Sequence, residues 1–251
     1  MPVGGHAGIA QHIFQQGARG EVARRGGSAA AVAKAGAAAI ASSSWAVAAA
    51  LGETDGERLA PETVLDCVRR MVRACPGLPV TADIEAGYSR DAAGVGDMVK
   101  ALLAAGAVGC NLEDGLPGDG TIRDPIQQAG RLRVARAAAD AFGVSLFINA
   151  RTDLFLRSKA EAHAGLVDDA LERARLYADA GADSLFVPGL ADPGLIARVA
   201  AESPLPVNVM VGAGPVDKAA LARAGVARIS YGPAPWLMAM QALEDLARAA
   251  L

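Results

Sequence analysis

A chain of 251 residues fits one α/β barrel or two small domains, and 52% of its residues are hydrophobic although only 4% are aromatic. The formal net charge is −3 and Lys and Arg form no cluster, which argues against nucleic acid or an anionic membrane surface as a partner. Cys67, Cys75 and Cys110 lack metal-ligand spacing and predict reduced thiols in a cytoplasmic protein. Residues 1–20 contain no continuous apolar segment of a secretory signal, and charged and polar residues interrupt the Ala-rich stretch 29–51, so no membrane helix is expected.

Helix-like and strand-like segments alternate along the chain at the spacing of a parallel α/β barrel. Seven strands are visible, and an eighth is expected before Gly26, in the poorly strand-like stretch 15–25. No linker or break in composition interrupts residues 1–251, so we predict one TIM-type (β/α)8 barrel domain. The expected elements, in chain order, are helix 29–37, strand 38–43, helix 61–74, strand 78–83, helix 91–105, strand 108–112, helix 124–142, strand 145–149, helix 165–180, strand 184–187, helix 195–202, strand 206–210, helix 216–224, strand 227–230 and helix 235–250.

The tripeptide Ala-Gly-Ala marks the ends of three of these helices. Its glycines, Gly36, Gly106 and Gly181, stand where a left-handed C-cap residue would lie, shortly before the next strand. Such repeated punctuation between helix and strand indicates a parallel sheet with right-handed crossovers.

Acidic residues stand at the ends of two successive strands. Asp83 and Glu85 are two residues apart, so on an extended backbone their side chains would share one face. Glu113 ends the next strand and is expected beside them, because parallel strands bring their carboxyl ends to one edge. Oxygen ligands of this kind suit Mg²⁺ or Mn²⁺ with several waters retained. An acidic cluster neutralised by arginines is the alternative.

Three further features could bind an anion or support the metal. Arg151 follows an apolar strand and could grip a carboxylate or phosphonate in a bidentate manner, or form a buried ion pair with Asp153 or Glu113. The turn Ser42-Ser-Ser-Trp45 could bind a carboxylate or an enolate oxygen, or simply cap the next helix. Asp55 could reach the metal's water shell or be an ordinary turn residue.

Several other mechanisms lack the residues they need. None of the four lysines falls in a predicted strand, which disfavours a Schiff-base aldolase. The three histidines lie far along the chain from the acidic strand ends, which disfavours a histidine base. The glycine-rich segment 115–120 lacks the Lys and Ser of a P-loop and predicts a gate over the site instead.

Taken together and in this order, the motifs resemble the isocitrate lyase/phosphoenolpyruvate mutase superfamily over most of the chain, from about Gly27 to Ala250. The matching segments are Gly27-Ser-Ala, Ala41-Ser-Ser-Ser-Trp with Gly52-x-x-Asp55-Gly-Glu, Thr81-Ala-Asp-Ile-Glu-Ala-Gly-Tyr, Asn111-Leu-Glu-Asp, Phe147-Ile-Asn-Ala-Arg-Thr-Asp, Ala180-Gly-Ala-Asp-x-Leu-Phe-Val-Pro-Gly, Pro206-Val-Asn-Val-Met and Gly225-Val-Ala-Arg-Ile-Ser-Tyr-Gly-Pro.

The resemblance implies an α/β barrel that uses Mg²⁺ to hold a 2-oxo acid or its enolate. It implies that Asp83 contacts the metal directly and that Asp55, Glu85 and Glu113 act mainly through its waters. Arg151 would bind the anionic end of the substrate. A homo-oligomer organised as a dimer of dimers, a homotetramer, is also implied, and a C-terminal helix swapped between subunits is a variant of the barrel that we consider.

By the same resemblance, Ser43 and the backbone of Ser44 and Trp45 would bind the pyruvyl carboxylate, and Asn208 is a candidate for the substrate pocket. The assigned catalytic residues are Arg151, Asp55 and Ser43, the substrate-binding residues are Ser43, Ser44, Trp45, Asp83, Arg151 and Asn208, and the metal-binding residues are Asp83, Glu85 and Glu113.

The chain also departs from the superfamily's patterns. The Lys-Lys-Cys-Gly-His gate motif of the isocitrate and methylisocitrate lyases is absent, and Gly115 stands where mutases and phosphonopyruvate hydrolases carry a lysine. Val187-Pro-Gly189 replaces a lyase glutamate, and Arg24-Arg25 replaces the usual Trp-Asp. Asp119, at the tip of the gate segment, is either a substitute polar group or a solvated loop residue.

These observations predict a Mg²⁺-dependent lyase that cleaves a C–C bond beside a 2-oxo or 2-hydroxy carboxylate through an enolate, with an oxaloacetate-like or alkylmalate-like substrate. The enzyme alternative is C–P bond chemistry of the phosphonopyruvate hydrolase or phosphoenolpyruvate mutase type. The other alternative is a non-catalytic barrel that binds a small dicarboxylate. Retention of all four candidate metal-shell carboxylates argues against this last possibility.

Overall fold

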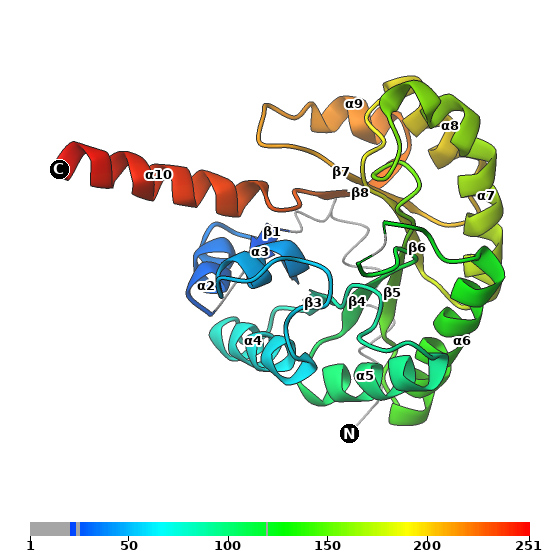
Figure 1. The fold of residues 1–251 in the computed structure, drawn as a ribbon, viewed down its shortest axis with the longest axis horizontal. Helices are drawn as coiled ribbons and strands as arrows, with labels where there is room; N and C mark the ends of the chain where they lie inside the picture. The colour runs from blue at the N-terminus through cyan, green and yellow to red at the C-terminus, as the bar shows by residue number, and fades with distance from the viewer. Residues whose placement is uncertain (1–20, 24–25, 119) are drawn as a thin grey trace.

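Eight parallel strands form one sheet whose order follows the chain from β1 to β8. The computed structural model describes residues 21–23, 26–118 and 120–251. The sheet curls on itself and the helices surround it (Figure 1), which confirms the predicted (β/α)8 arrangement. Among the described residues no ladder joins β8 to β1. The strands are β1 (Glu21–Ala23), β2 (Ile40–Ser42), β3 (Val80–Asp83), β4 (Gly109–Glu113), β5 (Phe147–Arg151), β6 (Ser184–Val187), β7 (Val207–Met210) and β8 (Val226–Ser230).

The helices begin at residues suited to helix N-termini. Asp91, Asp124 and Asp192 each accept a hydrogen bond from a backbone N–H of the first turn, which pairs a donor that the helix leaves unused. Pro61, Pro125 and Pro193 each open a helix, and the fixed φ of proline suits the first helical position. The helices are α2 (Gly26–Lys34), α3 (Ser44–Ala49), α4 (Pro61–Ala74), α5 (Ala92–Ala104), α6 (Pro125–Phe142), η1 (Ala160–Ala162), α7 (His163–Asp179), α8 (Pro193–Glu202), α9 (Lys218–Arg223) and α10 (Ala234–Ala250).

The expected punctuation is present, with a few shifts at element ends. Gly36, Gly106 and Gly181 have φ values of 91°, 94° and 91°, the left-handed conformation predicted for them. β1 lies within the stretch where an eighth strand was expected, although residues 15–20 and 24–25 are outside the described part of the chain. The short helix α3 was not predicted, because the strand was expected to run on to Ser43.

The sheet has an apolar outer face and a polar interior near its carboxyl end. Leu112 and Leu185 are fully buried in the apolar core that the strands share with the helices. On the other face, the Asn149 amide donates to Asn111 Oδ1 at 2.8 Å and accepts from the Ser184 hydroxyl at 2.5 Å. Residues at alternate positions of each strand therefore bring polar groups into the barrel, below the functional site.

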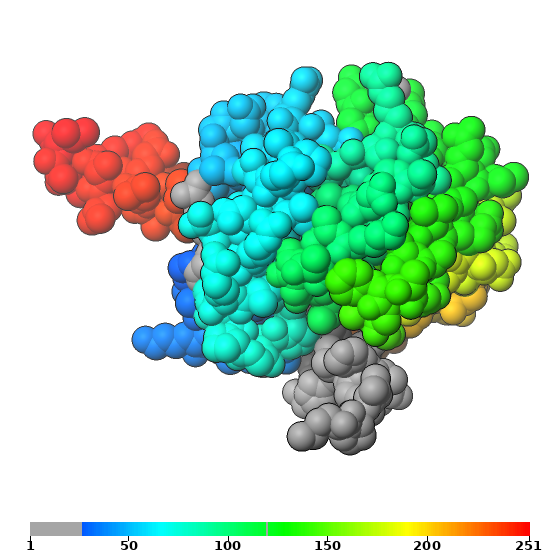
Figure 2. All heavy atoms as spheres, turned by 90° about the horizontal axis from the view of Figure 1, so that it is seen from below, coloured from blue at the N-terminus to red at the C-terminus, as the bar shows by residue number. Residues whose placement is uncertain are grey.

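Helix α10 extends away from the rest of the molecule, as Figures 1 and 2 show from two directions. Its apolar side chains are solvent-exposed, with Leu243 at 58% and Leu246 at 70%. Near its start, the Trp236 ring meets the Trp45 ring of α3 edge-on, with centroids 5.5 Å apart. Within the described residues, no helix combines the length and apolar character needed to cross a membrane.

Candidate active site

A cavity of about 210 Å³ opens where the strands end at their carboxyl side. This is the edge at which (β/α)8 proteins build their sites. Its polar walls come from the turn after β2, from the ends of β3, β4, β5 and β8, and from the loop that carries Asp55. The lining residues are Ala41, Ser42, Ser43, Ser44, Trp45, Asp55, Asp83, Asn111, Arg151, Leu156, Phe186, Pro188, Met210, Arg228, Ser230, Gly232 and Pro233.

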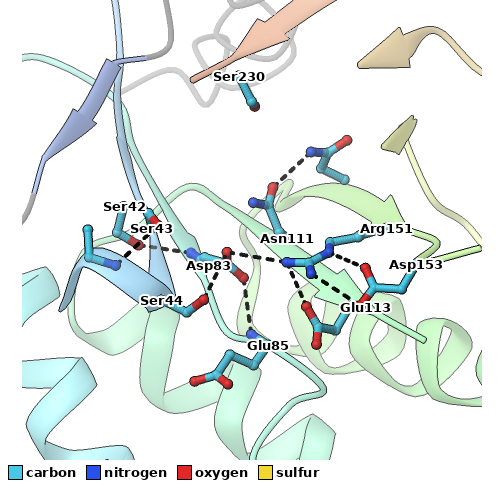
Figure 3. A network of polar contacts seen from close by, with 12 residues as sticks. Ser42, Ser43, Ser44, Asp83, Glu85, Asn111, Glu113, Arg151, Asp153 and Ser230 are labelled. Carbon is cyan, nitrogen blue, oxygen red and sulfur yellow. Dashed lines mark hydrogen bonds and ion pairs between the residues drawn. The ribbon is translucent and has the colours of Figure 1, made fainter. Parts of the chain in front are cut away.

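The serine turn after β2 both caps a helix and holds Asp83 (Figure 3). Ser43 Oγ accepts a hydrogen bond from Ala46 N at 3.3 Å, which makes Ser43 the N-cap of α3. Ser42 Oγ accepts from Asp83 N at 2.9 Å, and the Ser44 hydroxyl donates to Asp83 Oδ2 at 3.3 Å. Ser43 therefore caps α3 and also lines the cavity, and its binding of a carboxylate stays a prediction.

The backbone after β3 turns sharply, which contradicts one expectation. Strand β3 ends at Asp83, and Glu85 has a φ of 50°, so the two side chains do not share the face of one extended strand. Asp83 Oδ1 instead accepts a hydrogen bond from Glu85 N at 3.2 Å. Tyr88 also has a positive φ, of 53°. Two non-glycine residues in this uncommon conformation mark a strained turn beside the cavity.

The Glu85 carboxylate is buried and accepts hydrogen bonds from three neighbouring donors. Its Oε2 accepts from the backbone N–H groups of Gly56 at 2.9 Å and Glu57 at 2.6 Å, and its Oε1 accepts from the Tyr88 hydroxyl at 2.6 Å. Burial raises the pKa of this carboxyl to about 7, and the negative charges of Asp55 and Asp83 act in the same direction. Glu85 thus ties the loop that carries Asp55 to the end of β3.

Arg151 forms the two ion pairs that the sequence left as an alternative. Its Nη1 lies 2.7 Å from Glu113 Oε2, and its Nε and Nη2 donate to the two oxygens of Asp153 at 2.6 and 3.2 Å. Burial alone would lower the pKa of Arg151, but Glu113, Asp153 and Asp83 outweigh it and raise that pKa. Nη1 also forms a longer ion pair with Asp83 Oδ2, at 3.9 Å. A guanidinium has five N–H donors, so the three shorter contacts leave two N–H groups.

A second layer of contacts fixes the ends of β4 and β5. The fully buried Asp114 accepts hydrogen bonds from Asp153 N at 2.9 Å, from Arg173 Nη1 at 3.0 Å and from the Tyr177 hydroxyl at 2.8 Å. Because Asp153 in turn holds Arg151, two residues of helix α7 determine where the cavity's guanidinium points. Buried networks of this kind are stable only when every member is paired.

The gate segment forms a short closed loop. Gly115 and Ile122 make an antiparallel bridge, and Leu116 N donates to Thr121 O at 2.9 Å. Asp119, the candidate polar group at its tip, lies outside the described residues. The role of the segment as a gate stays a prediction.

The acidic groups around Asp83 have the chemistry of a divalent-metal site. Burial raises the pKa of the Asp55 carboxyl, and the negative charge of Asp83 raises it further. Burial likewise raises the pKa of Glu113, on which the charge of Asp83 also acts. Arg151 offsets only part of this negative charge, because Asp153 already occupies one edge of its guanidinium. In the described parts of the chain, no three Asp, Glu, His or Cys side chains converge as direct ligands. An ion held mainly through its waters needs fewer direct carboxylate ligands, and the metal-binding role of Asp83 stays a prediction.

The structure brings most of the assigned residues to one cavity. Six of the assigned residues line it: Ser43, Ser44, Trp45, Asp55, Asp83 and Arg151. Glu85 and Glu113 flank it through their contacts with the Asp55 loop and with Arg151. Asn208 is not among the lining residues, but it exchanges hydrogen bonds of 3.2 and 3.3 Å with Ser230, which lines the cavity. The roles of all these residues stay predictions.

Three polar lining residues were missed: Asn111 on β4, and Arg228 and Ser230 on β8. Arg228 and Ser230 lie two apart on β8 and both line the cavity. A sequence signal was available, because an arginine inside a short strand of otherwise small and apolar residues is unusual unless it faces a polar interior.

A family model described as phosphoenolpyruvate phosphomutase matches residues 25–251. The chain belongs to this family. Membership confirms the resemblance to the phosphoenolpyruvate mutase/isocitrate lyase superfamily and places the chain among lyases and mutases. A solved structure from Burkholderia cenocepacia J2315, provisionally assigned as a phosphonomutase, is 49% identical, with a TM-score of 0.89 and 91% coverage of both chains.

Curated relatives of this chain include enzymes that catalyse different reactions. The chain is 33% identical to an oxaloacetate decarboxylase of Rhodopseudomonas palustris (strain BisB18), over 80% of this chain and 69% of that protein. It is 32% identical to a 2-methylisocitrate lyase of Salmonella typhimurium, over 58% of this chain and 48% of that protein. The chain spans only 41–60% of the length of the first curated relatives it matches. The family is therefore shown, while the reaction is a matter for proposal.

Proposed function

We propose that this protein is a Mg²⁺-dependent lyase that cleaves a C–C bond beside a 2-oxo or 2-hydroxy carboxylate through an enolate, with an oxaloacetate-like or alkylmalate-like substrate. The observation that carries the proposal is the arrangement of Asp83 and its neighbouring carboxylates opposite Arg151 and the serine turn, in one small cavity. A cavity of about 210 Å³ suits a small acid. Similarity to an oxaloacetate decarboxylase and a 2-methylisocitrate lyase supports this substrate class.

The residues of the chain would divide the work as follows. Asp83 would hold the metal directly, and Asp55, Glu85 and Glu113 would hold its waters, while Mn²⁺ could replace Mg²⁺. The bound cation would supply Lewis-acid stabilisation of negative charge on the substrate's oxygen. Glu85 would also keep the Asp55 loop over the site, since it binds the backbone N–H groups of residues 56 and 57.

The serine turn and Arg151 would bind the two ends of the substrate. The first backbone N–H groups of α3, at Ser44 and Trp45, have no acceptor within their helix, so together with Ser43 they can receive a carboxylate. Arg151 would offer its two remaining N–H donors to the other anionic end. Asp153 holds the guanidinium plane in one orientation, so little entropy is lost when the ligand binds.

A screen for product release tests this function. Purified protein is incubated with Mg²⁺ and a panel of 2-oxo acids and 2-alkylmalates, and pyruvate or enolate release is followed, with EDTA-treated protein and Asp83→Ala as controls. Release that depends on both the metal and Asp83 is the expected result. No activity on any member of the panel, with phosphonopyruvate turned over instead, would favour the C–P alternative. Saturable binding without any turnover would favour the non-catalytic barrel.

Cleavage of isocitrate or 2-methylisocitrate is expected to be negligible. No cysteine or lysine occurs between Glu113 and Arg123, so the gate lacks the thiol of the isocitrate-type lyases and the lysine of the mutases. Steady release of glyoxylate from isocitrate would show that another residue supplies the proton.

We also infer that the protein is a homo-oligomer, organised as a dimer of dimers in which α10 packs on a second copy. The exposed leucines of α10 would bury apolar surface there, and each could contribute about 1.5–3 kcal/mol. Light scattering of Leu243→Asp and Leu246→Asp tests this, because either charge should dissociate the assembly. Arg198→Gln, on α8, is a control that should leave the mass unchanged.

The buried thiols of Cys75 and Cys110 are free, which supports a cytoplasmic location.

A further inference from the structure

One buried cation of the cavity has two nitrogens without a hydrogen-bond partner in the described part of the chain. Arg228 is only 4% exposed, and its Nε and Nη1 atoms find no hydrogen-bond acceptor among the described residues. Two other buried arginines have more partners. Arg151 forms ion pairs with three carboxylates, and Arg131 donates to the carbonyl oxygens of Ala86, Ser89 and Arg90, although its Nε also lacks an acceptor among the described residues. Buried polar groups in native proteins are nearly always paired, so the two unpaired nitrogens of Arg228 call for an explanation.

Arg228 lies at the wall of the cavity. It lies on β8 and lines the cavity together with Ser230, two residues further along the same face of the strand. The ladder register runs from Arg151 through Phe186 and Asn208 to Arg228, so three strand spacings separate the two arginines around the barrel. Figure 3 shows Ser230 on the far side of this space from the serine turn and Arg151.

The charges around Arg228 leave room for an anion. Asp83 is the carboxylate whose charge acts on it, yet the two form no ion pair in the described structure, and Asp83 is assigned here to the metal. Burial lowers the pKa of Arg228 to about 10, so the guanidinium remains protonated at neutral pH. A buried charge without a counter-ion is unfavourable, and an anion entering the cavity would relieve that cost.

We propose that Arg228, assisted by the Ser230 hydroxyl, binds an anionic group of the ligand that Arg151 does not hold, so that the cavity selects small dianions over monoanions. Arg228 would thus determine substrate specificity for the lyase proposed above, and this inference rests on that proposed function. Asn208 would act as a positioning residue, because its amide fixes the Ser230 hydroxyl.

Calorimetry with matched acids tests the proposal without requiring turnover. The dianions malonate, succinate and malate are compared, in the presence of Mg²⁺, with their methyl isosteres propionate, butyrate and 2-hydroxybutyrate. We expect at least one dianion to bind wild-type protein roughly 30-fold or more tightly than its isostere, and this preference to fall to about threefold or less in Arg228→Gln. The isostere itself should bind both proteins equally, which a general structural defect would not allow. Phosphonoacetate in the same panel distinguishes a phosphonate from a carboxylate at this position.

Two further variants keep the test decisive. Arg228→Lys retains the charge without the planar fork and should show an intermediate preference, and it replaces Arg228→Gln if the latter does not fold. Arg198→Gln removes an exposed arginine on α8 and should leave the preference unchanged. The proposal is overturned if wild-type protein prefers no dianion, or if the preference survives in Arg228→Gln. A preference without any lyase activity would instead refute the proposed reaction and leave the role of Arg228 standing.

Discussion

Replacing Gly189 with alanine should destabilise the protein strongly, although it adds one methyl group. Gly189 follows β6 with a φ of 89°, and a Cβ there would lie 2.7 Å from the backbone nitrogen of Leu156 and 2.8 Å from the Phe155 carbonyl carbon. A left-handed backbone costs a residue with a Cβ roughly 1–2 kcal/mol. Moving the neighbouring backbone adds about 1–3 kcal/mol, for a total of about 2–5 kcal/mol.

Thermal unfolding measures this cost. For a domain of this size, about 2–5 kcal/mol corresponds to a fall in Tm of roughly 4–20 °C at fixed protein concentration. The control is Gly130→Ala in α6, where no atom lies within 4 Å of the added Cβ and where alanine should stabilise the helix by about 0.5–1 kcal/mol. If Gly189→Ala melted within about 1 °C of the wild type, the argument from backbone contact would be refuted. Since Leu156 lines the cavity, the variant should also bind ligand less tightly.

Three further predictions concern the site itself. Asp83→Ala should abolish Mg²⁺ binding in calorimetry, because water-mediated neighbours cannot replace a direct ligand, and an unchanged affinity would remove the assigned role. Arg151→Lys should lower kcat/KM by roughly 30- to 1000-fold, because a point charge cannot serve Asp153, Glu113 and a ligand together, whereas unaltered kinetics would make Arg151 structural. Mg²⁺ affinity should fall by up to about tenfold per pH unit below 7, since protons then compete for Glu85, whose pKa is about 7 in the metal-free protein, and Glu85→Gln should flatten that dependence.

The repeating features of the fold could be predicted because each has a local cause. The left-handed glycines at 36, 106 and 181 and the helix beginning at Pro61 depend on neighbouring residues alone. Strand β5 was expected to end at Asn149 but continues to Arg151, because pairing with β4 and β6 holds Ala150 and Arg151 in the ladder.

The site could be predicted only in part, for a similar reason. Asp83 and Arg151 follow apolar strands, so the strand-end argument places them correctly. Glu85 was expected on an extended backbone, but its backbone is left-handed. Its carboxylate binds the backbone of residues 56 and 57, which are distant in sequence, and the hydroxyl of Tyr88, which the turn brings back to it. An arginine in the short strand β8 could have been singled out from the sequence, but only the assembled barrel shows that two nitrogens of Arg228 lack an acceptor among the described residues.

The contact between Trp45 and Trp236 joins the lip of the cavity to the helix that leaves the body of the protein. Trp45 belongs to the turn proposed to receive a carboxylate, and Trp236 lies in the first turn of α10. If α10 packs against a second copy, assembly fixes Trp236 and, through it, the turn. Thermodynamic linkage then requires reciprocity: whatever factor assembly adds to ligand affinity, ligand adds to the affinity between subunits. Dilution would weaken ligand binding, and saturating ligand would hold the assembly together at lower protein concentration.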